Sequence, residues 1–177
     1  MELREIFDRQ LILKLEETIF TQSLPWCLNH SDSKIDKQLG KFHESFAVVW
    51  QCLESHFEDI KKLENSCIKM YEERNRRWKK EDSKILIYPS GYDGLIHRDY
   101  GNEIDKLTTI TFLNSGWEKS WGGEILCYSD DCKVVLGGVT PEFGQTFLFD
   151  GSKPHRALAP IRLSSLMRAV LVTKEAD

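Results

Sequence analysis

Long apolar runs are missing from this sequence, and so is an excess of charge of either sign. Its 177 residues carry 24 lysines and arginines against 28 aspartates and glutamates, and the basic residues are dispersed among acidic ones. No apolar stretch approaches the roughly 20 residues of a membrane-spanning helix, and the N-terminal MELREIFDRQ lacks the apolar core of a signal peptide. We therefore expect a cytoplasmic protein with neither a nucleic-acid nor a membrane partner.

The cysteines give no indication of a disulfide framework or of a thiolate metal site. The five cysteines are odd in number and form no C-x-x-C pair, which argues against a disulfide framework and against a thiolate zinc site. Disorder is also disfavoured, because 41% of the residues are hydrophobic and 11% are aromatic. The chain is long enough to bury one core, so we expect a single domain over residues 1–177, of unknown oligomeric state.

The spacing of apolar residues changes near residue 83. Before it, three segments place apolar residues three or four apart, which predicts helices. These segments are residues 6–19, residues 43–60 and a stretch that runs from Leu63 toward Trp78. Between the first two, Pro25 and a polar tail predict a short strand and a loop. Residues 1–82 are therefore expected to be a mainly helical support region.

From residue 83 onward, short apolar runs alternate with turn signals such as PSGYDG and SDD. The runs are KILIY, LTTITFLN, EILCY, KVVLGGV, QTFLFD and MRAVLVT. This rhythm is typical of short strands in a sandwich or barrel. We predict an α+β fold in which residues 83–177 form a jelly-roll-like double sheet, with the N-terminal helices packed on one sheet.

Three H-x-[DE] matches raise the question of a metal site: His30 with Asp32, His56 with Glu58, and His97 with Asp99. Roughly one such match is expected by chance at this acid content. Residues two apart on a helix face different sides, which disfavours the pair at residue 56, in a predicted helix. The pair at residue 30 lies in a polar loop. His97 and Asp99 follow an apolar pair in an extended segment, where residues two apart share a face.

A third ligand is needed, because two side chains hold a catalytic metal poorly. His155 is the candidate, since it follows the apolar run TFLFD and a turn. Two histidines and one carboxylate leave three open positions on an octahedral ion, which is the arrangement of non-heme Fe(II) oxygenases. A zinc site with the same three ligands stays open as an alternative at this point.

Five motifs follow one another over residues 84–174. They are LIYPSGYDGLIHRD, LTTITFLN, WEKSWGGEILCY, VTPEFGQTFLFDGSKPH and RAVLVTK. Their order and spacing resemble the Fe(II)/2-oxoglutarate-dependent dioxygenases, in the branch that includes the prolyl 4-hydroxylases. The resemblance implies a double-stranded β-helix, which is a cupin-like barrel. It also implies Fe(II), 2-oxoglutarate and O2, with ascorbate as a further cofactor.

The resemblance assigns roles to individual residues. His97, Asp99 and His155 match the iron ligands, and Arg168 in LMRAVLVT matches the basic residue that pairs with the distal carboxylate of 2-oxoglutarate. A planar guanidinium suits this pairing because it meets a carboxylate through two N–H groups. Arg162 is the rival, and we prefer Arg168 because it begins an apolar strand whose inward face would carry it into the barrel.

Further cosubstrate contacts are expected on neighbouring strands. Tyr88 matches a tyrosine that hydrogen-bonds the cosubstrate, with simple packing as the alternative role. Some relatives have a second tyrosine where this chain has Phe112, and Thr109 or Thr111 is expected to supply a hydroxyl there. The two glycines of WGGE are expected to permit a tight turn or a close approach of strands.

The implied reaction is hydroxylation of an unactivated C–H bond, with decarboxylation of 2-oxoglutarate to succinate. Asp99 favours hydroxylation over halogenation, because related halogenases lack this carboxylate and so leave room for chloride. A peptidyl proline is the expected substrate, and a free amino acid, a sugar or a natural product is the alternative. Trp117 and Trp121 are candidates for the mouth of the substrate pocket, and residues 30–41 and 100–106 are candidate lids.

Two functions of other classes stay open at the level of the sequence. A cupin-like zinc or manganese isomerase would share the barrel and the three ligands but would need no cosubstrate arginine. A non-catalytic binding module that kept the fold would tolerate loss of Asp99. The intact set of His97, Asp99 and His155 favours an enzyme over the binding module.

Overall fold

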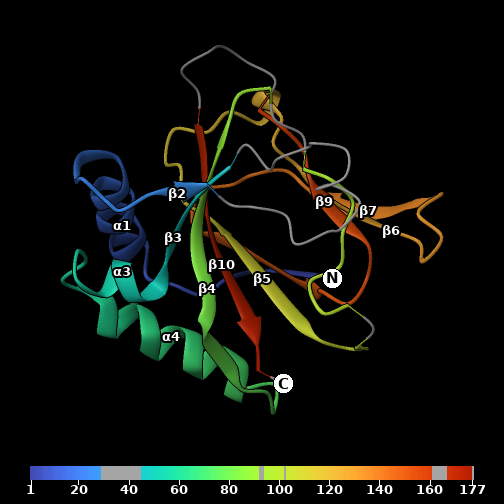
Figure 1. Ribbon diagram of the computed structural model, residues 1–177, viewed down its shortest axis with the longest axis horizontal. Helices are drawn as coiled ribbons and strands as arrows, with labels where there is room; N and C mark the ends of the chain where they lie inside the picture. The colour runs from blue at the N-terminus through green and yellow to red at the C-terminus, as the bar shows by residue number, and fades with distance from the viewer. Residues whose placement is uncertain (29–44, 92–93, 102, 161–166, 177) are drawn as a thin grey trace.

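The computed structural model describes residues 1–28, 45–91, 94–101, 103–160 and 167–176 (Figure 1). The helices are α1 (Arg9–Thr21), α3 (Trp50–Glu54), α4 (Ile60–Glu72) and the short 3-10 helix η1 (Lys119–Trp121). The strands are β1 (Glu2–Glu5), β2 (Cys27–Leu28), β3 (Phe46–Val49), β4 (Trp78–Pro89), β5 (Leu107–Phe112), β6 (Ile125–Tyr128), β7 (Val135–Val139), β8 (Gln145–Asp150), β9 (His155–Ala157) and β10 (Met167–Glu175). The predicted α+β class is confirmed, and every apolar run predicted after residue 83 contains a strand.

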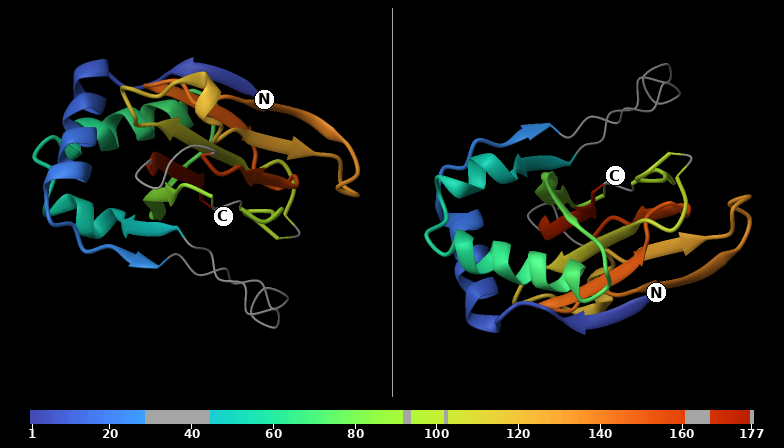
Figure 2. Two further views of the ribbon diagram at one scale, coloured as in Figure 1. Left: turned by 90° about the horizontal axis from the view of Figure 1, so that it is seen from above. Right: turned by 90° about the horizontal axis from the view of Figure 1, so that it is seen from below.

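Two antiparallel sheets make up the β layer. The larger has seven strands in the order β1-β8-β5-β10-β4-β3-β2, and the smaller has three in the order β7-β6-β9. The helices lie on one side of the large sheet and the small sheet lies on the other (Figures 1 and 2). Within the described ranges, no strand pairing joins the two sheets into a closed barrel. The core strands β5, β8, β4 and β10 therefore contact helices on one face and the small sheet on the other.

The side chains of strand β10 alternate between the two faces of the large sheet. Ala169 and Leu171 belong to the apolar cluster that includes residues of α1, α3 and α4, whereas Val170 and Val172 belong to the cluster that includes residues of β6 and β9. Successive side chains of a strand point to opposite faces, so this alternation buries both sets. Arg168 has the same parity as Val170 and therefore lies on the face toward the small sheet.

Helix α1 is specified locally. Its N-cap Asp8 accepts hydrogen bonds from the backbone N–H groups of Gln10 and Leu11, at 3.0 and 3.1 Å. Leu11, Leu15 and neighbouring apolar residues at spacings of three and four face the core. Among the described helices, none is long and apolar enough to cross a membrane.

Two helix predictions need correction. Residues 43–60 do not form one helix, because Phe46–Val49 is strand β3, paired with β4, and among the described residues 45–59 only Trp50–Glu54 is helical. The spacing of apolar residues there fits a helix, but Phe46–Val49 forms a strand because its backbone pairs with that of β4. The third helix ends at Glu72 and does not run toward Trp78, since Asn75 adopts a left-handed backbone (φ 55°) and Trp78 begins β4.

The predicted short strand between the first two segments is confirmed as β2, which pairs with β3. The loop predicted after it lies outside the described residues.

Candidate metal centre

His97 and Asp99 lie between β4 and β5, and His155 is the first residue of β9. His97 and His155 form an antiparallel bridge in which each backbone N–H donates to the carbonyl oxygen of the other residue at 2.9 Å. The N–H of Asp99 donates to the carbonyl of Gly151 at 2.8 Å, so the segment runs beside the turn before β9. This extended pairing places the His97 and Asp99 side chains together, as the period of two predicts.

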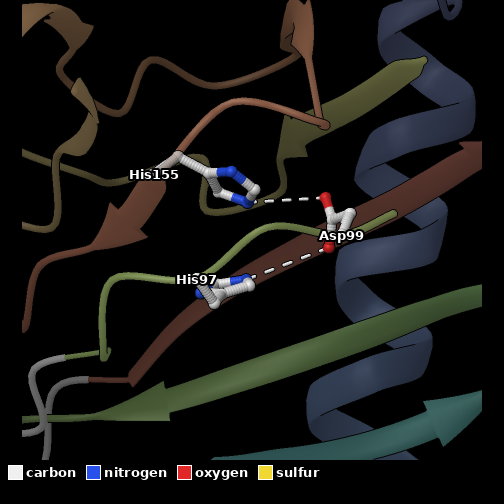
Figure 3. Close-up of side chains that lie close together, drawn as sticks. All are labelled: His97, Asp99 and His155. Carbon is white, nitrogen blue, oxygen red and sulfur yellow. Dashed lines mark ion pairs between the residues drawn. The ribbon is translucent and has the colours of Figure 1, made fainter. Parts of the chain in front are cut away.

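The three side chains converge on a small space (Figure 3). One ligand atom from each of His97, Asp99 and His155 lies within 4.8 Å of the others. His155 Nε2 is 3.4 Å from Asp99 Oδ2, and His97 Nε2 is 3.9 Å from Asp99 Oδ1. His155 is buried and the Asp99 side chain is 9% exposed, while the side chain of His97 is 45% exposed. The site therefore opens toward the surface on the His97 side.

Both imidazoles are oriented by backbone carbonyls. His97 Nδ1 is 2.9 Å from the carbonyl oxygen of Leu95, and His155 Nδ1 is 2.9 Å from that of Lys153. Because a carbonyl oxygen only accepts hydrogen bonds, each Nδ1 carries a proton, and Nε2 is the ring nitrogen left to bind a metal ion. Each Nε2 faces Asp99, so all three ligand groups point toward the same space.

The Asp99 carboxyl is held in its ionised form. Burial on its own would raise the pKa of Asp99, but the hydrogen bond with His155 and the charges of His155, Lys174 and His97 outweigh it and hold this pKa below its usual range. Thr108 Oγ1 also donates to Asp99 Oδ2 at 2.7 Å. The carboxylate is therefore available as an anionic ligand at neutral pH.

Arg168 is fully buried and only partly paired. One of its terminal nitrogens, Nη1, donates to the carbonyl oxygen of Gly123, and its guanidinium carbon lies 4.5 Å from the centre of the Tyr88 ring. Its Nε and Nη2 have no hydrogen-bond partner among the described residues. Burial lowers the pKa of Arg168 to about 10, so it stays cationic at neutral pH. A buried cation with two unpaired nitrogens is costly unless a carboxylate pairs with it.

The comparisons with known families give the context for this site. The sequence model of the 2OG-Fe(II) oxygenase superfamily matches residues 83–172, just over half of the chain. The chain belongs to this superfamily. As a 2OG-Fe(II) oxygenase it is an oxidoreductase, and its family implies Fe(II) and 2-oxoglutarate. The matched residues include all three candidate metal ligands and Arg168. A comparison with curated proteins found no match.

Solved structures share the fold of this oxygenase at low sequence identity. A prolyl hydroxylase from Trichoplax adhaerens, in complex with a hypoxia-inducible factor peptide fragment, matches with a TM-score of 0.74 and 16% identity, over 99% of this chain and 83% of that one. A Pseudomonas putida prolyl-4-hydroxylase matches with a TM-score of 0.59 and 16% identity, over 98% and 90% of the two chains. The 2-oxoglutarate-dependent epimerase SnoN from nogalamycin biosynthesis matches with a TM-score of 0.66 and 11% identity, over 99% and 76%.

These matches confirm the predicted family and fold class, a double-stranded β-helix with added helices. The residues present also fit the cofactors that the superfamily implies. Two imidazoles and one carboxylate form a donor set suited to Fe(II). The unpaired N–H groups of Arg168 suit the distal carboxylate of 2-oxoglutarate.

The structure brings Tyr88 to the site but not Thr109 or Thr111. Tyr88 lies under Arg168, on the face of the sheet toward the small sheet. Thr109 and Thr111 point to the other face of β5, where their hydroxyls are hydrogen-bonded to Thr173 (2.6 Å) and Thr146 (2.8 Å). Ile110 and Phe112 occupy the positions of β5 that face the small sheet, so the two threonines face away from the candidate site.

The competing sequence matches do not form a second metal site in the described chain. His56 is not in a helix as predicted, because α3 ends at Glu54, and its Nδ1 instead lies 2.8 Å from the carbonyl oxygen of Cys52. Among the described residues, only His97, Asp99 and His155 gather as possible metal ligands. The match at residues 30 and 32, the candidate lid at residues 30–41, the rival Arg162 and Asn102 of the other candidate lid lie outside the described residues.

The WGGE segment contacts Arg168 directly. Gly122 and Gly123 have positive φ angles of 75° and 84°, which glycine adopts without strain. A Cβ atom on Gly123 would lie 3.1 Å from both Arg168 Cδ and Trp117 Cζ2, so the predicted close approach is confirmed. Trp117 and Trp121 pack edge to face with ring centres 5.6 Å apart. Their predicted place at the mouth of a substrate pocket stays a prediction.

Sequence reasoning did not find two residues that contact Asp99. They are Thr108, which donates to Oδ2, and Lys174, whose Nζ lies 2.9 Å from Oδ1. Thr108 of β5 and Lys174 of β10 are directly opposite each other in the antiparallel pairing of these two strands. That register is a tertiary property, so the only available signal was the shared parity of Thr108 with Ile110 and Phe112 in LTTITF.

Proposed function

We propose that this oxygenase hydroxylates an unactivated C–H bond in the manner of a prolyl hydroxylase, with decarboxylation of 2-oxoglutarate to succinate. The observation that carries the proposal is the pairing of two features on one side of the large sheet. A set of three metal-ligand side chains lies on the same side of the sheet as a buried arginine that has unused N–H groups. An isomerase with the same fold would have no use for such a buried cation.

The chain's own residues have separate tasks in this proposal. His97 Nε2, His155 Nε2 and Asp99 hold the iron, and Arg168 pairs with the distal carboxylate of 2-oxoglutarate. When bound, the iron and 2-oxoglutarate would activate O2, with one oxygen atom ending in succinate as CO2 is released and the other in the hydroxyl that replaces the C–H hydrogen. Two carbonyls keep the imidazoles in the tautomer that presents Nε2, so the ligands are oriented in advance.

In this proposal Tyr88 orients Arg168 and donates a hydrogen bond to the cosubstrate. Its ring lies against the guanidinium of Arg168, which fixes the orientation of that cation. Burial raises the pKa of Tyr88 above its usual value, so its hydroxyl stays protonated and able to donate a hydrogen bond. Apolar neighbours such as Phe147 and Val170 surround this part of the sheet and exclude water from it.

A peptidyl substrate is favoured by the open side of the site. Small-molecule pockets usually enclose most of the ligand surface, whereas His97 is almost half exposed. A peptide segment can lie across such an opening and present one side chain to the metal. Hydroxylation of a small metabolite is the alternative, and it predicts no acceleration of 2-oxoglutarate turnover by proline-containing peptides.

The decisive experiment is anaerobic addition of Fe(II) and 2-oxoglutarate. We expect a weak visible charge-transfer band, followed by release of succinate when oxygen is admitted. His97→Ala should lose both signals, because one of the three ligands is removed. His56→Ala is the matched control, since this histidine also precedes an acidic residue by two positions but bonds to the carbonyl of Cys52. Absence of the band and of succinate in the unmodified protein would overturn the proposal.

We also propose that residues 1–177 act as one domain. Side chains from both predicted parts, such as Leu15 and Leu63 before residue 83 and Ile85 and Leu171 after it, belong to one buried cluster. This shared core supports the helical part as a structural backing of the sheet that carries the site.

A further inference from the structure

Lys174 contacts the candidate metal ligand Asp99 from the far end of β10. Its Nζ lies 2.9 Å from Asp99 Oδ1, and both side chains are largely buried, at 18% and 9% exposure. On the other oxygen, Thr108 Oγ1 donates to Oδ2 at 2.7 Å. Apart from the two candidate ligand histidines, each oxygen of the carboxylate therefore has one donor from the protein, and the donor on Oδ1 is a cation.

Tyr100 fixes the position of the Lys174 ammonium. The ammonium lies 5.8 Å from the centre of the Tyr100 ring, within the range of a cation–π contact. The Tyr100 hydroxyl donates to the carbonyl of Leu107 at 2.8 Å and accepts from the N–H of Glu175 at 2.6 Å. These bonds tie the ring to both β5 and β10, so Lys174 is held beside Asp99 by two strands.

The two sides of Asp99 differ toward a cation. A metal ion near Oδ1 would meet the positive charge of Lys174, whereas near Oδ2 it would meet the neutral hydroxyl of Thr108. Oδ2 is also the oxygen nearer to a histidine, at 3.4 Å from His155 Nε2, compared with 3.9 Å between Oδ1 and His97 Nε2. Charge and distance therefore both favour Oδ2 as the metal ligand.

We propose that Lys174 is a positioning residue that reserves Asp99 Oδ1 and so makes Asp99 a one-oxygen ligand. The inference rests on the proposed function of the site. Carboxylates bind metal ions through one oxygen or through both. With one oxygen from Asp99 and two imidazoles, an octahedral ion keeps three open positions, and a second oxygen would remove one of them. Lys174 thereby preserves the positions that 2-oxoglutarate and O2 require.

The test compares Lys174→Met with Lys106→Met. Lys106 is the matched control because its Nζ also lies near the Tyr100 ring, at 6.0 Å, but it bonds to the carbonyl of Ala176 and to Glu103 rather than to Asp99. Lys174→Arg keeps the positive charge, and Lys174→Gln removes it with a polar side chain in case the methionine variant fails to fold.

Two readouts separate positioning from a structural role. Water-proton relaxation of the Mn(II)-loaded proteins counts the waters on the metal, and anaerobic titration of the Fe(II) charge-transfer band gives the Kd for 2-oxoglutarate. We expect Lys174→Met and Lys174→Gln to have one metal-bound water fewer and a Kd raised about tenfold or more. Lys106→Met and Lys174→Arg should match the unmodified protein in both measurements.

The outcomes distinguish this proposal from the function on which it rests. An unmodified protein that shows no charge-transfer band would contradict the oxygenase function itself. A normal band in the unmodified protein, together with an unchanged water count and Kd in Lys174→Met and Lys174→Gln, would refute the role of Lys174 alone. Equal effects in Lys106→Met and Lys174→Met would also refute it, because they would show a general effect on Tyr100.

Discussion

At the scale of single residues, the site depends on where unsatisfied polar groups are buried. Two nitrogens of Arg168 are unpaired within the described structure, while the Asp99 oxygens and both imidazole Nδ1 atoms are all engaged. An unpaired buried donor costs roughly 1–3 kcal/mol, and more when it is charged. A cost of this kind at the place where a carboxylate is expected indicates a binding group rather than a packing defect.

Gly123 sets the position of Arg168, and this leads to a prediction. Gly123→Ala should weaken 2-oxoglutarate binding by about fivefold or more, roughly 1 kcal/mol, because the new methyl group would displace Arg168 Cδ, 3.1 Å away. Gly144→Ala is the control, since Gly144 has a similar φ of 78° but an added Cβ meets no atom within 4 Å. Both variants should lose about 1–2 kcal/mol of stability through backbone strain. Equal Kd values for 2-oxoglutarate in the two variants would contradict this role of Gly123.

At the scale of elements, ion pairs made by the buried Glu64 connect α4 to the large sheet. Glu64 of α4 lies 2.7 Å from Lys80 of β4 and 2.7 Å from Lys61, and it accepts a hydrogen bond from Trp50 Nε1 at 3.3 Å. Its side chain is 9% exposed. Burial on its own would raise the pKa of Glu64, but its bonds with Lys61, Lys80 and Trp50 outweigh burial and lower this pKa to about 2.

The depressed pKa of Glu64 predicts acid sensitivity. Since the folded pKa lies below the ordinary glutamate value of 4.5, the stabilisation is fully present above pH 4.5 and is lost as the pH falls toward 2. It amounts to at most about 3 kcal/mol. Glu64→Gln should therefore lower stability at pH 7 and flatten the fall of stability between pH 5 and 2, measured by urea unfolding at several pH values. The exposed Glu58→Gln should leave that slope unchanged, and an identical slope in Glu64→Gln would contradict the assignment.

At the scale of the whole molecule, the helices and the large sheet bury one cluster together. Leu63 of α4 is fully buried in this cluster with residues of β4 and β10. The face of β10 that meets the helices is thus directly behind the face that carries Arg168. The helical part is therefore expected to determine the rigidity of the strand that holds the cosubstrate.

This shared cluster predicts a single unfolding transition. Leu63→Ala should reduce the free energy of unfolding by about 2–5 kcal/mol, because it leaves a cavity between α4 and the sheet. Far-ultraviolet circular dichroism and tryptophan fluorescence should report the same midpoint in the variant as well as in the unmodified protein. The exposed Ile68→Ala on the same helix should change stability little, since its side chain faces solvent. Separate midpoints for the two probes would show that residues 1–82 fold independently.

The sequence by itself determined the strands after residue 83, the family and the pairing of His97 with Asp99. These features depend on local patterns, namely short apolar runs, turn residues and a period of two in an extended segment. It also predicted that Arg168 faces inward, because the parity of an apolar strand assigns its side chains to faces.

Only the tertiary structure decided which neighbours those residues have. Phe46–Val49 is a strand because β4 offers hydrogen bonds to it, although its apolar spacing fits a helix. Thr109 and Thr111 face away from the site while Thr108 faces Asp99, and Lys174 reaches the same carboxylate. Strand register and the approach of distant segments depend on pairing across the chain, which no local pattern encodes.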